Sequence, residues 1–253
     1  MSVTPGDIEM TEAKAGPPPQ ALHFLPTGKI FGRILYKERV KLRRGWYLLA
    51  LFNLLAVARL YVETRHLFRM DHAEIVWYRT IELGHIYYES LRYLPLFSAL
   101  ILAVIQFLPE MRDERLRLSL HLPVRAHSII FSHLLVGSVL LAALMALSAG
   151  GLVLVTRLYF PGEIVYSALM TSAPWFLAGL CAYLGTALAM LEPGLKLRIF
   201  NLLLSAGLLA PLLLKAVPGA YAPALPRLLL LPPLLLAAAL LPAYHFRHRK
   251  AEV

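Results

Sequence analysis

The sequence predicts an all-α integral membrane protein, with about six transmembrane helices preceded by an amphipathic interfacial helix. Of the 253 residues, 58% are hydrophobic and only 16% are charged, whereas soluble domains carry about 25% charged residues. Several apolar runs approach the roughly 20 residues that a helix needs to cross the hydrocarbon core. The runs are continuously apolar and do not alternate, which favours helices over a β-barrel because each run must satisfy its own backbone in lipid.

The N-terminal part divides into two segments before the first apolar run. Residues 1–27 contain Pro17, Pro18 and Pro19 and no apolar stretch typical of a signal peptide, which predicts a disordered tail. Residues 28–45 predict an amphipathic helix in the membrane interface, with its basic side toward anionic headgroups; a plain basic flank of the first span is the alternative. The basic residues recur at three- and four-residue spacing: Lys29, Arg33, Lys37, Lys41 and Arg44.

Residues 46–244 predict the transmembrane domain, and residues 245–253 a basic cytoplasmic tail. Residues 63–92 are polar, with Gly84 as their only glycine or proline, so we expect helical extensions or a helical hairpin outside the membrane. Pro232 and Pro233 should kink or shorten the last span. The six spans are expected at about residues 46–62, 93–109, 129–155, 168–190, 199–215 and 228–244.

Lysine and arginine counts predict the orientation. With both termini in the cytoplasm, the inside segments hold 17 of these residues and the outside segments hold 8. The positive-inside rule favours this arrangement. The net charge of +10 is therefore interpreted as a topology signal, and we expect no nucleic-acid partner.

Sequence motifs for catalysis are missing from this chain. Gly28-Lys29 has no upstream glycine and no following Ser or Thr, so the G-x-x-x-x-G-K-[ST] pattern of nucleotide hydrolysis fails, and neither H-E-x-x-H nor G-x-S-x-G occurs. The single cysteine, Cys181, excludes an intrachain disulfide. We expect no enzymatic activity, no cofactor and no metal on this chain.

Polar residues inside the spans are few. Asn53, Gln106 and Asn201 could line a pathway or bond across helix interfaces. The sequence shows no buried set of Asp, Glu, Lys and Arg, which argues against a proton- or ion-coupled carrier. His133, near the start of the third span, is expected to be hydrogen-bonded at the interface rather than to act in a proton relay.

Small residues at four-residue spacing predict close helix packing, either within the bundle or between protomers. They are Ala142, Ala146 and Gly150 on the third span, and Ala178, Ala182 and Thr186 on the fourth.

Residues 109–127 form a short charged segment between two apolar spans. Charges of both signs are interspersed with leucines up to Pro123, so the segment cannot cross a bilayer. It predicts a docking element on the cytoplasmic face; an ordinary polar loop is the alternative. The candidate docking residues are Glu110, Asp113, Glu114, Arg115, Arg117, His121, Pro123 and Arg125.

This segment resembles the loop after the second span in permease subunits of ABC-2-type transporters. That loop has an acidic residue, a leucine-rich turn and a Leu-Pro-Val ending followed by a basic residue. In this chain the acidic residue would be Glu110 or Glu114, the turn would be residues 118–122, and the ending would be Leu122-Pro123-Val124-Arg125. The Gly-Thr of the family is absent, and His133 lies near the place of a lysine often found early in the third span. An amphipathic helix, about six spans and internal termini are also usual for the family.

The resemblance implies a multi-pass subunit in the cytoplasmic (inner) membrane of a bacterium. It implies an export pathway formed with a second permease subunit, as a homo- or heterodimer. Two separate ATPase subunits, which bind ATP and Mg²⁺, would dock on residues 109–127 as the coupling helix. A non-transporting membrane scaffold of an envelope complex is the runner-up, and an intramembrane enzyme a third reading.

Overall fold

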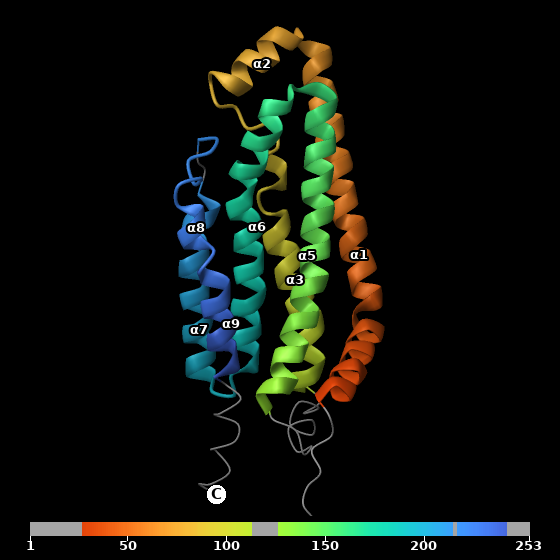
Figure 1. Cartoon of the computed structure of the whole chain (residues 1–253), viewed down its shortest axis with the longest axis vertical. Coiled ribbons are helices and arrows are strands. Elements are labelled where there is room, and N and C mark those ends of the chain that lie inside the picture. The colour runs from red at the N-terminus through yellow and green to blue at the C-terminus, as the bar shows by residue number, and fades with distance from the viewer. Residues whose placement is uncertain (1–26, 113–125, 215–216, 242–253) are drawn as a thin grey trace, which may run out of the picture.

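The computed structural model describes residues 27–112, 126–214 and 217–241. Within these residues the chain is helical, without a strand, and the long helices lie side by side in an upright bundle (Figure 1). The elements in chain order are α1 (Thr27–Met70), α2 (Ala73–Ile81), η1 (Glu89–Leu91), α3 (Leu94–Arg112), α5 (Ala126–Tyr159), α6 (Gly162–Leu191), α7 (Leu195–Leu209), η2 (Ala210–Leu213), α8 (Leu225–Leu228) and α9 (Leu231–Leu240).

Five helical stretches in the described residues are long and apolar enough to cross a membrane. They are Leu35–Met70, Glu89–Met111, Ser128–Tyr159, Gly162–Leu191 and Leu195–Leu213. The helical membrane character predicted from the sequence is thereby supported. The sixth predicted span, at 228–244, corresponds to the shorter apolar stretch Leu225–Leu240, about 24 Å long at 1.5 Å per residue. Prolines at the starts of α8 and α9 divide this stretch, so the count of six stays a prediction.

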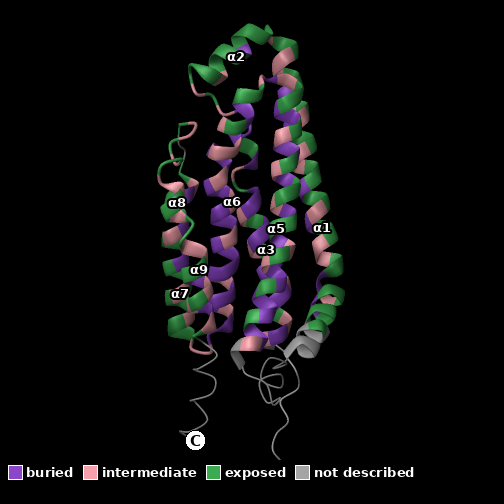
Figure 2. Cartoon of the chain, viewed as in Figure 1, coloured by how far each residue is buried: buried purple, intermediate pink, exposed green. Residues whose placement is uncertain are grey.

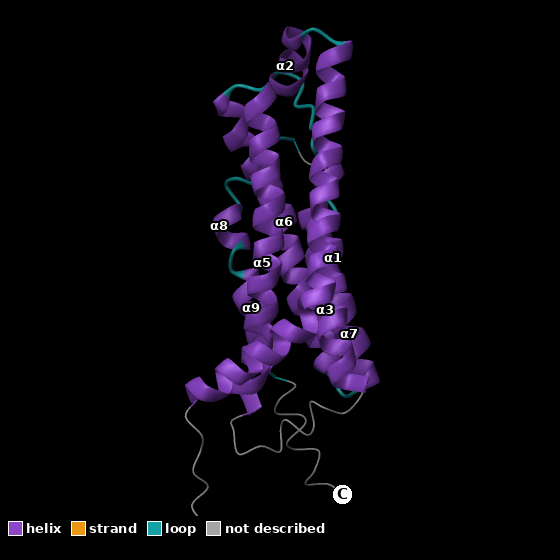
Figure 3. Ribbon diagram, turned by 90° about the vertical axis from the view of Figure 1, so that its right-hand side faces the viewer, coloured by secondary structure: helices purple, strands orange, loops and turns teal. Residues whose placement is uncertain are grey.

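The predicted interfacial helix and the first span are one continuous helix, α1, of 44 residues. No proline interrupts 28–70, so nothing in the sequence forces a break. Its first turns incline away from the bundle axis (Figure 3). Gly45 lets α1 approach α3, because a Cβ there would lie 2.9 Å from Ile105 Cδ1. The interfacial position of residues 28–45 stays a prediction.

Helix α6 lies at the centre of the bundle, and α1 and α7 lie at its edge. In the most apolar stretch of 18 residues of each helix, 78% of the residues are buried in α6 but only 17% in α1 and in α7. Figure 2 shows the purple of buried residues concentrated along α6. Large apolar side chains such as Leu48, Phe52 and Leu203 are therefore exposed on the outside of the bundle. In water such a surface would be unfavourable, whereas in a bilayer it faces lipid.

The two predicted rows of small residues differ in burial. Ala178 and Ala182 on α6 are buried inside the bundle, as expected for close packing between helices. Ala142, Ala146 and Gly150 on α5 are exposed on its outer side.

One end of the bundle, here called the N-terminal end, gathers the start of α1, the end of α3 and the start of α5 (Figure 1). The turn between α6 and α7 and the end of α9 lie at this end too. The opposite end is covered by α2 and packed with aromatic rings. Tyr87 stacks on Phe160 with ring centroids 4.5 Å apart and shares a hydrogen bond of 2.6 Å with the Thr156 hydroxyl. Burial raises the pKa of Tyr87 above its usual value.

Candidate functional site: a buried ionic network

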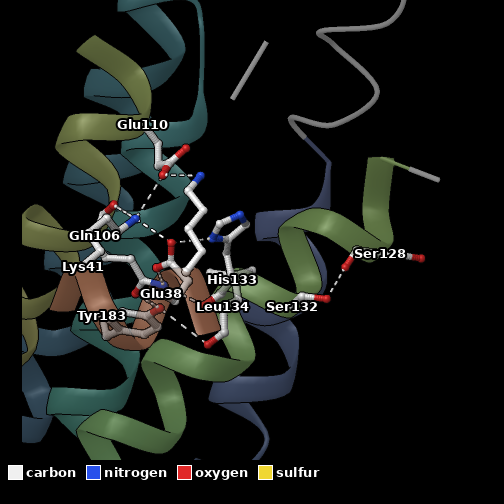
Figure 4. Close-up of polar contacts among 10 residues, drawn as sticks. Glu38, Lys41, Gln106, Glu110, Ser128, Ser132, His133, Leu134 and Tyr183 are labelled. Carbon is white, nitrogen blue, oxygen red and sulfur yellow. Dashed lines mark hydrogen bonds and ion pairs between the residues drawn. The ribbon is translucent and has the colours of Figure 1, made fainter. Parts of the chain in front are cut away.

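Charged and polar side chains from four helices meet inside the bundle near its N-terminal end (Figure 4). All but Lys41 are at most 4% exposed, and the Lys41 side chain is 17% exposed. We call the set the buried ionic network. It consists of Glu38 and Lys41 on α1, Gln106 and Glu110 on α3, His133 on α5 and Tyr183 on α6.

Glu38 lies at the centre of the network and is fully buried. Its Oε1 lies 2.6 Å from Lys41 Nζ and 3.2 Å from His133 Nδ1. Its Oε2 accepts a hydrogen bond of 3.0 Å from Gln106 Nε2. One carboxylate therefore links α1 to α3 and α5 besides supplying the anion that compensates Lys41.

Glu110, four residues after Gln106 on α3, forms the second ionic centre. Its Oε1 lies 3.1 Å from Lys41 Nζ and 3.0 Å from Lys37 Nζ. Lys41 Nζ also donates to the backbone carbonyl of Gln106 at 3.0 Å. Lys37 and Lys41 lie one helical turn apart, so they share the face of α1 that meets α3. The Lys37 side chain is 44% exposed and marks the solvent edge of the network.

Gln106 joins the network across the bundle. Its Nε2 donates to Glu38 and, at 2.8 Å, to the backbone carbonyl of His133, while its Oε1 accepts from Tyr183 Oη at 2.7 Å. Gly137 on α5 makes room for this contact, since a Cβ there would lie 1.9 Å from Tyr183 Oη and 2.2 Å from Gln106 Oε1. A glycine is therefore required where α5 crosses the pair.

The network holds charged groups in pairs inside the bundle. Charges inside a membrane bundle are tolerated only where they pair, and removing one partner leaves an uncompensated charge at a cost of about 3–5 kcal/mol. Among the residues that the structure describes, no three His, Cys, Asp or Glu side chains are placed to hold a metal ion. What this arrangement can do is to bind four helices together through titratable groups.

A second polar contact lies deeper in the bundle and explains Asn53. Its Nδ2 donates to Ser98 Oγ on α3 at 3.0 Å, and its Oδ1 accepts from Ser148 Oγ on α5 at 2.7 Å. Asn53 thus bonds across three helices, which was one of its two predicted roles. Asn201 is half-buried on α7, where its backbone carbonyl accepts from Ser205; a pathway role for it stays a prediction.

The structure corrects two expectations about charge. The expected absence of a buried ionisable set was wrong, because Glu38 and Glu110 are buried and both pair with the partly buried Lys41. Glu110, expected among the docking contacts, points into the bundle and is 2% exposed. The physical reason is that α3 continues to Arg112 as a helix, which keeps Glu110 on the inward face opposite α1.

The basic residues of α1 divide between the inside and the outside of the bundle. Lys41, and in part Lys37, turn toward Glu110 rather than toward headgroups, while Arg44 is exposed. The side chains of Lys29 and Arg33 lie outside the described residues. The other docking candidates also lie outside them: Asp113, Glu114, Arg115, Arg117, His121, Pro123 and Arg125.

Sequence reasoning missed Glu38, Tyr183 and Gly137 as site residues. A signal for Glu38 was present, because an acid three residues before Lys41 within a basic helix places opposite charges on one face. Tyr183 and Gly137 carry no such signal, since their role depends on which helices touch.

Comparison with family models, with curated proteins and with solved structures gives no match to this chain.

Proposed function

We propose that this chain is a membrane-spanning permease subunit of an ABC-2-type transporter, in which separate ATPase subunits dock on residues 109–127 and drive the bundle. The observation that carries the proposal is the position of the buried ionic network. Helices α3 and α5 flank segment 113–125, and the network ties both of them to α1 and α6. The resemblance of segment 109–127 to the coupling loop of this family supports the same reading.

The network gives this segment a mechanical connection to the bundle. A displacement at 113–125 acts first on the end of α3, where Glu110 is paired with Lys41, and on the start of α5, where His133 faces Glu38. Separating a buried ion pair costs several kcal/mol, so small movements are transmitted to α1 rather than absorbed locally. A docked ATPase would in this way move three spans together.

The test begins with purification of the tagged chain from its native membrane in a mild detergent, followed by identification of copurifying proteins. We expect a roughly stoichiometric ATPase with a P-loop. Reversing the charges of Glu114 and Arg117 together should abolish stimulation of its ATP hydrolysis by the chain without unfolding the bundle. Lys196→Glu, at an exposed position on α7 at the same end, is the matched control and should leave the coupling intact.

The membrane scaffold is the competing function, and the same purification separates the two. Copurification with partners that lack a P-loop, repeated in several detergents, contradicts the transporter proposal and favours the scaffold. An ATPase whose activity ignores the double reversal shows that segment 109–127 is not the coupling element.

A further inference from the structure

The first turns of α1 carry two sets of basic side chains on two different faces. Lys37 and Lys41 pair with carboxylates on the inner side, toward α3. Three exposed arginines lie on the outer side instead: Arg39, Arg43 and Arg44. None of these three forms an ion pair within the part of the chain that the structure describes. The outer face therefore keeps a positive charge that can attract an anionic partner.

The three arginines share this outer face with exposed aromatic and apolar residues. Tyr36, Arg43 and Tyr47 recur at helical spacing and fall on one stripe, and Arg39 and Arg44 lie on its two sides. Both tyrosines are exposed. Large exposed apolar side chains continue the face toward the middle of the helix: Leu48, Leu51, Phe52, Leu54 and Leu55. One face of α1 thus changes from cationic to apolar within a single turn.

The position of the arginines along α1 matches the headgroup layer of a bilayer. Residues 45–58 contain no Asp, Glu, Lys or Arg, a length of about 21 Å at 1.5 Å per residue, so Arg44 is the last charge before the apolar part of the span. From Arg39 to Arg44 the axis advances by about 7.5 Å, close to the roughly 5–8 Å that one headgroup layer adds to the hydrocarbon core. Exposed tyrosines are typical of the same layer. The guanidinium groups are therefore expected at the level of lipid phosphates.

We propose that this outer face of α1 is a binding site for an anionic phospholipid. The phosphate and the anionic headgroup bind Arg39, Arg43 and Arg44, and the acyl chains lie along Leu48 and Leu51. Guanidinium groups suit this ligand, because their planar fork matches the oxygens of a phosphate. A free phosphate ion would leave the apolar part of the face unused, whereas a phospholipid occupies both parts. The inference rests on insertion of the bundle in a membrane and does not depend on an ATPase partner.

The site gives the same turns of α1 an anionic partner on each side. On the inner side Lys41 contacts the carboxylates of Glu38 and Glu110. On the outer side Arg39 and Arg43 contact lipid phosphate. Headgroup binding thus moves from the face expected from sequence, which included Lys41, to the opposite face. The first turns of α1 are then held both by the bundle and by the membrane surface.

A fluorophore placed next to the arginines tests the proposal. Leu48→Cys, at an exposed position four residues after Arg44, would be labelled with monobromobimane in the full chain. The native Cys181 is buried, and the chain without Leu48→Cys gives the background. The labelled protein is placed in phosphatidylcholine vesicles with a small fraction of nitroxide-bearing phosphatidylglycerol or of nitroxide-bearing phosphatidylcholine. The ratio of the two quenching efficiencies measures the preference of this face for the anionic lipid.

One basic side chain near the surface favours an anionic lipid by about fivefold, so we expect a ratio of at least about five. Replacing Arg39, Arg43 and Arg44 together by glutamine should bring the ratio close to one. The matched control replaces three exposed arginines at the opposite end of the bundle by glutamine and should keep the high ratio: Arg65, Arg69 and Arg157.

Three results overturn the proposal. A ratio near one with the arginines in place shows a face that contacts lipid without preference. A high ratio that survives their replacement shows that other groups select the lipid. A fluorophore that neither lipid quenches shows that protein covers this face, such as a second copy of the chain.

A second measurement covers the case in which the triple glutamine variant does not insert or fold. Raising NaCl from about 0.1 M to about 1 M shortens the Debye length from about 10 Å to about 3 Å. The quenching ratio of the protein with all three arginines should fall at least twofold, because the exposed guanidinium groups are screened. Replacing the three arginines by lysine keeps the charge and should keep both the preference and its salt dependence. A ratio that ignores salt overturns the proposal.

Discussion

Replacing Gly137 by alanine tests whether the contact between Gln106 and Tyr183 is as tight as the structure shows. The added Cβ would lie 1.9 Å from Tyr183 Oη and 2.2 Å from Gln106 Oε1, well inside van der Waals contact. Both partners are fully buried, so neither can move into solvent. The hydrogen bond between them must break or α5 must shift away from α6.

The magnitude follows from three terms. Overpacking a buried site costs about 1–3 kcal/mol, and loss of one buried hydrogen bond costs about 0.5–1.5 kcal/mol. Alanine regains up to about 1 kcal/mol over glycine within a helix. The net loss in the free energy of unfolding is about 2 kcal/mol, which lowers Tm by about 4–8 °C for a chain of this size.

A thiol-reactive fluorophore gives the assay, because the buried Cys181 reacts when the bundle unfolds. Gly150→Ala is the matched control on the same helix: a Cβ there meets nothing within 4 Å, so Tm should stay the same or rise slightly. Equal melting temperatures for Gly137→Ala and the native protein would refute the packing argument, as would an equal loss in both variants.

Three further predictions concern the charged and polar groups. Lys41→Met leaves Glu38 and Glu110 without their shared ammonium and should cost about 3–5 kcal/mol, measured as a fall in Tm by the same assay; an unchanged Tm contradicts the pairing. Asn53→Leu removes two interhelical hydrogen bonds at roughly 0.6 kcal/mol each, so chemical denaturation should show a loss near 1 kcal/mol. Burial raises the pKa of Tyr87, so the folded state keeps a proton that the unfolded chain loses above about pH 10. Stability should therefore fall as pH rises above 10, and less steeply in Tyr87→Phe.

Hydropathy predicted most of the fold, because it depends on local runs of residues. The apolar runs at 93–109, 129–155 and 168–190 correspond to α3, α5 and α6. The boundary expected at residue 45 is absent, since α1 runs through it without a break. The change from basic to apolar composition is a change of environment along one helix, and hydropathy cannot distinguish that from two helices.

The candidate site was predicted only in part, for a physical reason. Gln106 and Asn53 were found because a polar residue in an apolar run needs a partner. Lys41 was assigned to the surface, because a basic amphipathic helix usually lies there, and Glu38 was missed. Which face of α1 meets α3 depends on packing that no local pattern specifies. The pairing of Glu110 with Lys41, 69 residues apart, was therefore invisible in the sequence.

The ion pairs of the network also bear on the predicted orientation of the chain. The inside count of 17 lysines and arginines includes Lys37 and Lys41, whose charges are compensated by Glu110 and Glu38. Leaving both out gives 15 against 8, so the positive-inside rule still favours the predicted orientation, with the N-terminal end in the cytoplasm. In that orientation the exposed side chain of Lys37 would lie at the cytoplasmic edge of the bundle, and its pairing with Glu110 would not weaken the topology signal of the remaining basic residues.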